Sequence, residues 1–255
     1  MSEVVLLGHL VRPSAWAPVL PRLEAAHRVT FLDVPGFGDA PLPTGPWDLP
    51  ALGRHLAETL ATRGLSAAHL VGISMAGSVA LETARTGAVA SVTAFSPPGF
   101  WSPAETARIM ATIGSLYAST LVARPLVALA GRSDFLRRRV WAGITAHPDL
   151  FDRAVADELV LDAARNMRHL ASPRSALTGL RAVAGYRLEP LEGSVPVTIA
   201  WGDRDRFTPY RSDATRARQV LPLARHVTLH GCGHLPMYDD PEQVADVILS
   251  TVADA

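Results

Sequence analysis

The sequence predicts an α/β fold class, with a mostly parallel sheet flanked by helices and a helical insertion in the middle of the chain. Short β-branched or apolar runs alternate with longer amphipathic segments, which is the pattern of βαβ units. Between residues 99 and 192 the alternation stops, and Ala-, Leu- and Arg-rich stretches broken by prolines replace it. The length of 255 residues is near the upper limit for one hydrophobic core. We therefore expect one core formed by residues 1–98 and 193–255, with residues 99–192 inserted as a helical cap.

Six runs are short, apolar and rich in β-branched residues, as expected of buried strands. In chain order they are Val4–Leu7, Val29–Asp33, His69–Ile73, Ser91–Phe95, Val197–Trp201 and Val227–Leu229. Helical spacing of Leu, Val and Ala appears in four further segments: Trp16–Ala26, Leu49–Arg63, Met75–Arg85 and Glu242–Val252. Asp240 followed by Pro241 is typical of a helix N-terminus and predicts where the last helix begins.

Charge, cysteine content and hydropathy limit the kinds of partner and the cellular location that we expect. Basic and acidic residues number 24 each, which gives no reason to expect nucleic acid or an anionic membrane as partner. Cys232 is the single cysteine, so no disulfide framework indicates secretion. The N-terminus lacks the basic region of a signal peptide, and no stretch reaches the ~20 apolar residues that span a bilayer. We expect a cytoplasmic protein that binds a small molecule.

A candidate nucleophile lies between a predicted strand and a predicted helix. Ser74 lies within Gly72–Gly77, with small residues two positions before it and two after it. A tight strand-to-helix turn around a strained serine requires small residues there. The turn would also place the backbone N–H of Met75 at a helix N-terminus, where it can stabilise an oxyanion. On this segment alone, an ordinary turn with an incidental serine explains the pattern equally well.

A candidate acid and a candidate base follow two later strands. The run ending at Trp201 leads into a turn that carries Asp203 and Asp205, and a glycine-rich turn near the C-terminus ends at His234. A histidine held between a serine and a carboxylate can take the serine proton and stay oriented as the imidazolium forms. Spacing does not choose between the two carboxylates, because the turn at Gly202 breaks the alternation of side chains.

At this point the chain resembles the α/β-hydrolase family over nearly its whole length. The motifs that carry the resemblance occur in the family's order: Val4–Leu10, Asp33–Gly38, Gly72–Gly77, Trp201–Asp205 with Pro209, and Gly233-His234. The resemblance implies an α/β-hydrolase fold with an eight-stranded, mostly parallel sheet and a cap over the active site. It also implies the catalytic triad Ser74, Asp205 and His234, with Asp203 as a turn residue or an arginine partner.

The sequence departs from the family after its first predicted strand. The family usually has His-Gly there, whereas this chain has Gly8-His9-Leu10. The resemblance implies that the backbone N–H of Leu10 is the second oxyanion donor beside that of Met75. His9 either contacts the substrate or packs on the loop, and the sequence leaves both readings open.

Apolar residues of the predicted cap are candidates for the pocket wall, because ligand sites are mostly apolar. Met110, Ile113 and Met167 are three of them, and they equally suit a cap core. The candidates for substrate contact are Trp101, Tyr117, Phe135 and Trp141, together with His9. We expect a hydrophobic ester or thioester as substrate.

The leading hypothesis is a carboxylesterase-like serine hydrolase that cleaves an ester, thioester or lactone through an acyl-enzyme. Two alternatives keep the same residues: a carbon–carbon bond hydrolase or acyltransferase on the same triad, and a receptor-like binding protein with little turnover. We expect no cofactor and no metal. His226, His230 and His234 are spaced by four, which separates neighbours by ~13 Å on a strand and prevents them from sharing one ion.

Overall fold

The computed structural model describes residues 1–122, 133–150, 157–159, 173–193 and 195–255. Its centre is one sheet of six strands in the order β2-β1-β3-β4-β5-β6, and every neighbouring pair is parallel. The strands are β1 (Glu3–Gly8), β2 (Arg28–Asp33), β3 (His69–Ile73), β4 (Ser91–Phe95), β5 (Val197–Gly202) and β6 (Arg225–Leu229). The six runs predicted as strands are these six, with ends that agree within two residues.

The family resemblance implied eight strands, and this count is wrong for the described chain. The sheet has six strands, and all six correspond to apolar runs in the sequence. The two additional strands implied by the resemblance were not assigned to any run of residues. A strand that joins a buried sheet needs an apolar run of its own, which explains why the count of eight is wrong here.

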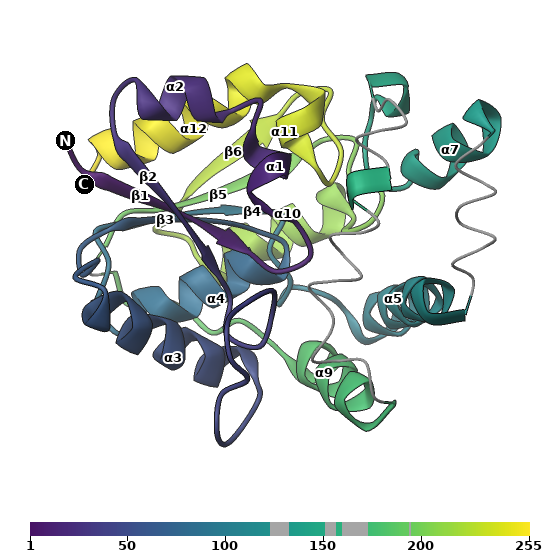
Figure 1. The fold of residues 1–255 in the computed structure, drawn as a ribbon, viewed down its shortest axis with the longest axis horizontal. Coiled ribbons are helices and arrows are strands. Elements are labelled where there is room, and N and C mark those ends of the chain that lie inside the picture. Colours follow the sequence, from purple (N-terminus) through teal and green to yellow (C-terminus); the bar gives the residue numbers. More distant parts are fainter. Residues whose placement is uncertain (123–132, 151–156, 160–172, 194) are drawn as a thin grey trace.

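Seven helices cover the two faces of the sheet. Strand side chains alternate between the faces, so that Val5 and Leu7 join one apolar cluster while Val4 and Leu6 join the other. The first face is covered by α3 (Leu49–Thr62), α4 (Met75–Ala84) and α10 (Tyr210–Val220). The second is covered by α1 (Pro13–Trp16), α2 (Leu20–Glu24), α11 (Pro236–Asp239) and α12 (Pro241–Ala253) (Figure 1).

Two of the predicted helices show how a local sequence signal sets the end of a helix. Asp240 caps α12, because its Oδ1 accepts the backbone N–H of Gln243 at 3.0 Å, as its position before Pro241 predicts. The single helix predicted at Trp16–Ala26 is instead the pair α1 and α2. Pro18 lies between them and has no N–H to continue the first helix, which explains the break.

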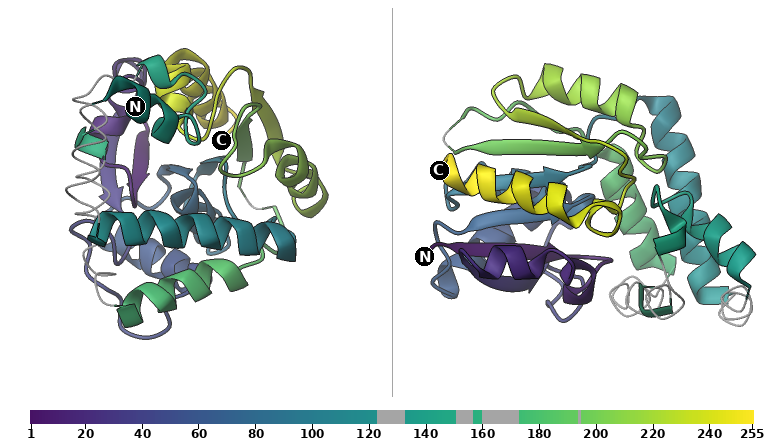
Figure 2. Two further views of the ribbon diagram at one scale, coloured as in Figure 1. Left: turned by 90° about the vertical axis from the view of Figure 1, so that its right-hand side faces the viewer. Right: turned by 90° about the horizontal axis from the view of Figure 1, so that it is seen from above.

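The described parts of the segment between β4 and β5 contain helices and no strand. They contain α5 (Pro103–Val122), α7 (Asp134–Trp141), a 3₁₀ turn (Pro148–Leu150) and α9 (Pro173–Gly185). These helices gather beyond the carboxyl ends of the strands, while both chain termini lie at the opposite side (Figures 1 and 2). That residues 99–192 act as a cap remains a prediction. Within the described ranges, no helix is long and apolar enough to cross a membrane.

Parallel pairing decides where the loops of the core meet. The carboxyl ends of all six strands share one edge, so the loops that follow β1, β3, β5 and β6 open on the same side. The strand order reverses direction between β1 and β3, the place where ligands bind in open α/β sheets. Leu10 follows β1 and Ser74 follows β3 at this reversal.

Candidate active site

Ser74 lies in a strained turn directly between β3 and α4. Its φ is 54° and its ψ is −130°, a combination that L side chains rarely adopt. The strain persists because the turn is fixed on both sides: the Ser74 N–H donates to the carbonyl of Phe95 at 2.8 Å, and α4 begins at the next residue. Strained residues of this kind cluster at functional sites. Ser74 is half-buried, so solvent reaches part of the residue.

Small residues around Ser74 are required by backbone crowding. A Cβ added at Gly72 would lie 2.5 Å from both the carbonyl carbon and the carbonyl oxygen of Ala76. Real Cβ atoms do not approach backbone this closely, so only glycine fits at position 72. Ala76 itself is fully buried, and its methyl group is accommodated. The sequence argument for small residues two positions before and after the serine therefore has a direct steric cause.

Asp205 and His234 form a buried pair. Asp205 follows β5, His234 follows β6, and the Nδ1–H of His234 donates to Asp205 Oδ2 at 2.9 Å. The two residues are only 6% and 5% exposed. Because this bond places the ring proton on Nδ1, it leaves Nε2 as a hydrogen-bond acceptor. In this orientation the imidazole can act as a general base.

The carboxylate of Asp205 is held by three further donors. Its Oδ1 accepts the backbone N–H groups of Phe207 and Thr208, each at 2.9 Å, and its Oδ2 accepts the Thr208 hydroxyl at 2.7 Å. The Thr208 hydroxyl also lies 3.2 Å from His234 Nδ1, and the Phe207 ring packs 4.7 Å from the imidazole, centroid to centroid. Sequence reasoning missed both residues. Their only signal was proximity to Asp205 in the turn.

Asp203 has a different environment from Asp205. Its Oδ1 accepts the backbone N–H of Gly231 at 2.9 Å, and its Oδ2 lies 3.3 Å from Nδ1 of the exposed His230. It thus joins the turn after β5 to the turn after β6. Spacing alone left both carboxylates open, and the family resemblance implied Asp205. In the structure Asp205 is the carboxylate that pairs with His234.

Ser74 and His234 belong to loops at the same sheet edge, and within the described residues no hydrogen bond joins them. Catalytic hydrogen bonds are often long without substrate, so the arrangement is compatible with proton transfer. In the same part of the chain, the N–H groups of Leu10 and Met75 donate to no other protein group. Both amides are therefore available as oxyanion donors.

His9 is a buried histidine with an unused nitrogen. It is 5% exposed, its ring meets that of Phe37 edge to face at 5.9 Å, and its Nδ1 has no hydrogen-bond partner. Burial, and after it the charge of nearby His234, lowers the pKa of His9 to about 3. The imidazole is consequently neutral at physiological pH.

The aromatic residues predicted to contact the substrate differ in exposure and in the groups around them. Trp101 is 4% exposed, and its indole N–H lacks a partner. Trp141 is buried in the apolar cluster that also contains Cys232 and Leu235. Phe135 is 68% exposed, with the Arg139 guanidinium 5.8 Å from its ring centroid.

Other predicted wall residues are less fully defined. Tyr117 belongs to α5, but its side chain lies outside the described part, as does all of Met167. Met110 and Ile113 are half-buried on α5. Two surface hollows, of about 600 and 780 Å³, are lined by other residues and do not include Ser74.

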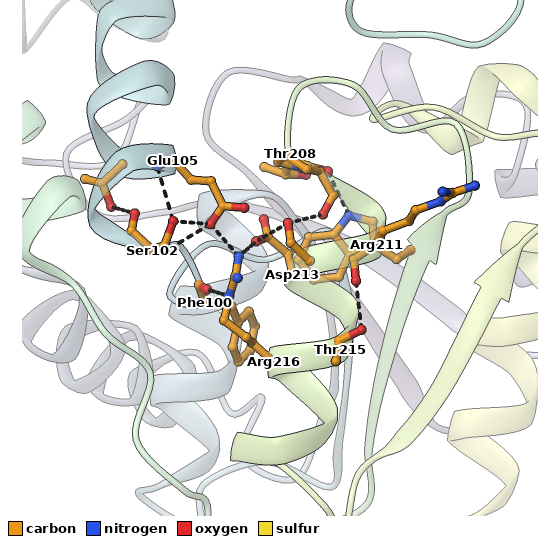
Figure 3. Close-up of polar contacts among 12 residues, drawn as sticks. Phe100, Ser102, Glu105, Thr208, Arg211, Asp213, Thr215 and Arg216 are labelled. Atoms are coloured by element: carbon orange, nitrogen blue, oxygen red, sulfur yellow. Dashed lines mark hydrogen bonds and ion pairs between the residues drawn. The ribbon is translucent and has the colours of Figure 1, made fainter.

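A charged cluster links the start of α5 to α10 (Figure 3). The Arg216 guanidinium lies 2.5 Å from both Glu105 Oε2 and Asp213 Oδ1, and its Nε–H donates to the carbonyl of Phe100. Glu105 also accepts the N–H and hydroxyl of Ser102. Burial raises the pKa of Asp213 to about 6 against the opposing effect of Arg216, and its Oδ2 is left without a partner.

Cys232 and His69 are buried residues with structural surroundings. Burial, followed by the charges of Asp239 and Asp240, raises the pKa of the Cys232 thiol to about 12, which keeps it protonated. His69 Nδ1 is paired with the Ser91 hydroxyl at 2.8 Å, a structural contact. Among the described residues, no cluster of His, Cys, Asp and Glu could hold a metal ion.

Comparison with known proteins matches this chain to one family and to named relatives. The family described as "Alpha/beta hydrolase family" matches residues 4–247. A pimeloyl-[acyl-carrier protein] methyl ester esterase of Aeromonas salmonicida is 26% identical, over 96% of this chain and 92% of its own length. Epoxide hydrolase EphH of Mycobacterium tuberculosis is 27% identical, over 79% of this chain and 93% of its own length.

Solved structures repeat the same architecture. An esterase from Thermogutta terrifontis superimposes with a TM-score of 0.71 and 20% identity, covering 100% of this chain and 90% of that one. A bromoperoxidase from Bacillus anthracis gives a TM-score of 0.75 at 20% identity, covering 99% and 92%. At these identities the likeness concerns the fold alone.

Proposed function

Because this chain belongs to the alpha/beta hydrolase family, we propose that it is a serine hydrolase that cleaves a carboxylic ester, thioester or lactone through an acyl-enzyme. The observation that carries the proposal is the buried Asp205–His234 pair, which lies at the sheet edge where the strained Ser74 is held. An imidazole oriented by a carboxylate, a half-buried serine and unused backbone N–H groups are the components that acyl transfer requires.

In the proposed reaction, Nε2 of His234 takes the proton of Ser74 as Oγ attacks the substrate carbonyl. The negative charge that develops on the carbonyl oxygen is stabilised by the N–H groups of Met75 and Leu10. Asp205 keeps the imidazole oriented and stabilises it as an imidazolium. His234 then gives the proton to the leaving group, and water attacks the acyl-enzyme by the reverse sequence of proton transfers.

Ester cleavage suits these residues better than the epoxide opening named for one relative. A serine oxygen that opened an epoxide would form an ether, which water does not cleave under these conditions. A covalent route to epoxide hydrolysis instead needs a carboxylate nucleophile, whose ester intermediate can be hydrolysed. Ser74, not a carboxylate, occupies the strained turn. The esterase among the relatives also favours a carboxylic ester as the substrate class.

We further propose that the substrate is small and largely apolar, with His9 and Trp101 as contacts. Both side chains are buried and carry a nitrogen that no protein group uses. A neutral imidazole and an indole N–H can bind an uncharged polar group of a ligand without the cost of burying another charge. Tyr117, Phe135 and Trp141 remain predicted contacts.

The test is a panel of acyl nitrophenyl esters and acyl thioesters of varied chain length. We expect Ser74→Ala and His234→Ala each to lower turnover by roughly 10³-fold or more, with the double variant little worse, because the residues act as a unit. A fluorophosphonate probe should label Ser74 and fail with Ser74→Ala. Labelling at another residue, or losses that add in the double variant, would contradict the proposal.

A further inference from the structure

We propose that Asp239 is a positioning residue for His234, and that it acts through residues 144–147 of the inserted segment, here called the strap. This inference rests on the proposed function, because it assigns a role in orienting the proposed base. Asp239 is the last residue of α11, five positions after His234. None of the hydrogen bonds of its carboxylate goes to the imidazole. The carboxylate contacts the backbone on both sides of the junction between the His234 turn and the strap.

The Asp239 carboxylate accepts four hydrogen bonds. One comes from the His234 turn: the N–H of Gly233 donates to Oδ2 at 2.7 Å. Three come from the strap: the N–H of Ala146 donates to Oδ2 at 3.1 Å, the N–H of His147 donates to Oδ1 at 2.9 Å, and the Thr145 hydroxyl donates to Oδ1. A single carboxylate therefore joins two segments that are about 90 residues apart in sequence.

The strap also accepts two hydrogen bonds from the same turn. The carbonyl of Ile144 accepts the N–H of His234 at 2.7 Å and the N–H of Leu235 at 3.1 Å. Three consecutive N–H groups, at positions 233, 234 and 235, thus end on either Asp239 or the strap. Thr145 and His234 are 3% and 5% exposed, so water does not readily replace these partners.

Close backbone contact explains the glycine before the base. A Cβ added at Gly233 would lie 2.7 Å from the Ala146 nitrogen and 2.8 Å from the Thr145 carbonyl carbon. The strap therefore packs directly on the turn, with no side chain between them. The backbone of His234 is fixed from the inserted segment, and its ring is fixed from the core by Asp205.

This arrangement affects catalysis because proton transfer depends on small distances. Displacement of a catalytic group by ~1 Å can cost about 100-fold in rate. An amide at position 239 would direct its NH₂ group at N–H donors and leave at least one of them unpaired. We therefore expect the turn to shift or loosen in Asp239→Asn, while Ser74, Asp205 and the substrate contacts remain in place.

The experiment compares Asp239→Asn with Asp246→Asn. Asp246 is a matched control, because it loses the same charge from α12, where it pairs with Arg22 on the surface. We expect Asp239→Asn to lower kcat on a nitrophenyl ester, and the rate of fluorophosphonate labelling, by roughly 10- to 100-fold with little change in KM. Asp246→Asn should match the wild type. Asp239→Glu, which restores the charge, should recover part of the lost rate.

A second measurement separates positioning from general stability and from the proposed function. Amide hydrogen exchange at residues 233–235 should accelerate in Asp239→Asn, while exchange in the core strands β3 and β4 stays unchanged. Wild-type labelling rates together with unchanged exchange at these amides would overturn the inference. If the wild-type protein is not labelled at all, the proposed function fails, and the exchange experiment alone decides whether Asp239 holds the turn.

Discussion

At the residue scale, the surroundings of Asp205 and Asp203 are unequal. Asp205 is buried and accepts hydrogen bonds from Phe207, Thr208 and His234, which fix the orientation of its carboxylate. Asp203 is more exposed and links two surface turns. An aspartate thus contacts the proposed base at position 205, whereas at position 203 it holds two turns together.

These surroundings predict opposite outcomes for two amide substitutions. Asp205→Asn should cut turnover by about 10²- to 10⁴-fold, because an amide can hold the wrong imidazole tautomer and cannot stabilise the imidazolium. Asp203→Asn should change turnover little and lower the free energy of unfolding by ~1 kcal/mol through a weakened turn. Thermal melting first establishes that both variants are folded, and steady-state kinetics then test the predicted turnover of each. An inactive Asp203→Asn beside an active Asp205→Asn would exchange the two roles.

At the scale of elements, Arg216 on α10 connects the core to the first inserted helix. Its guanidinium reaches Glu105 in the first turn of α5 and Asp213 on its own helix (Figure 3). Asp213 is fully buried at its side chain, whereas Arg216 remains 32% exposed. Removing the cation would leave a buried carboxylate uncompensated, which costs more than the pair contributes.

Arg216→Met should therefore lower the free energy of unfolding by about 1 to 3 kcal/mol at pH 7, a range reduced for its partial exposure. The loss should be smaller at pH 5, because Asp213 has a raised pKa and can then take up a proton. Arg211→Met is the control: Arg211 lies on the same helix, is exposed and points away from the cluster (Figure 3). Denaturant unfolding at both pH values measures the effect, and equal losses for the two variants would exclude the link.

At the scale of the whole molecule, two buried groups make stability depend on pH in opposite directions. The pKa of His9 falls to about 3 in the fold, so the stability it supports is present above 6.5, its unfolded value, and declines as the pH falls below it. The pKa of Asp213 rises to about 6, so its burial destabilises the fold above that pH and ceases to do so as the pH falls toward 3.8.

His9→Gln should flatten the acid side of the stability curve. Between pH 6.5 and 5 the wild type should lose about 2 kcal/mol more than the variant, because the unfolded His9 gains a proton that the folded form resists. The difference between the two curves isolates His9, since Asp213 contributes equally to both. Urea unfolding at half-unit pH steps measures it, and parallel curves would show that His9 is protonated in the folded state.

The elements show why much of the fold could be predicted. Each strand is an apolar run of its own, and α3 and α12 each carry an apolar stripe and begin after a capping aspartate. α4 is buried at every position and follows directly from the turn at Ser74. α10 was missed because its buried positions are only Asp213, Ala214 and Ala217, too few for a recognisable stripe. It is stabilised by its neighbours, which a local pattern does not record.

By itself, the sequence determined the fold class, the six strands and the residue types at the strand ends, because periodicity and the need for small residues at Ser74 act over a few positions. Residue spacing left Asp203 and Asp205 open and the family resemblance implied Asp205, which the tertiary structure brings to His234 across 29 residues. The tertiary structure alone decided that Asp239 meets the strap. Contacts of this kind depend on which strands are neighbours and where the inserted segment returns to the sheet edge. Local preferences do not contain that information, since it arises when distant segments pack together.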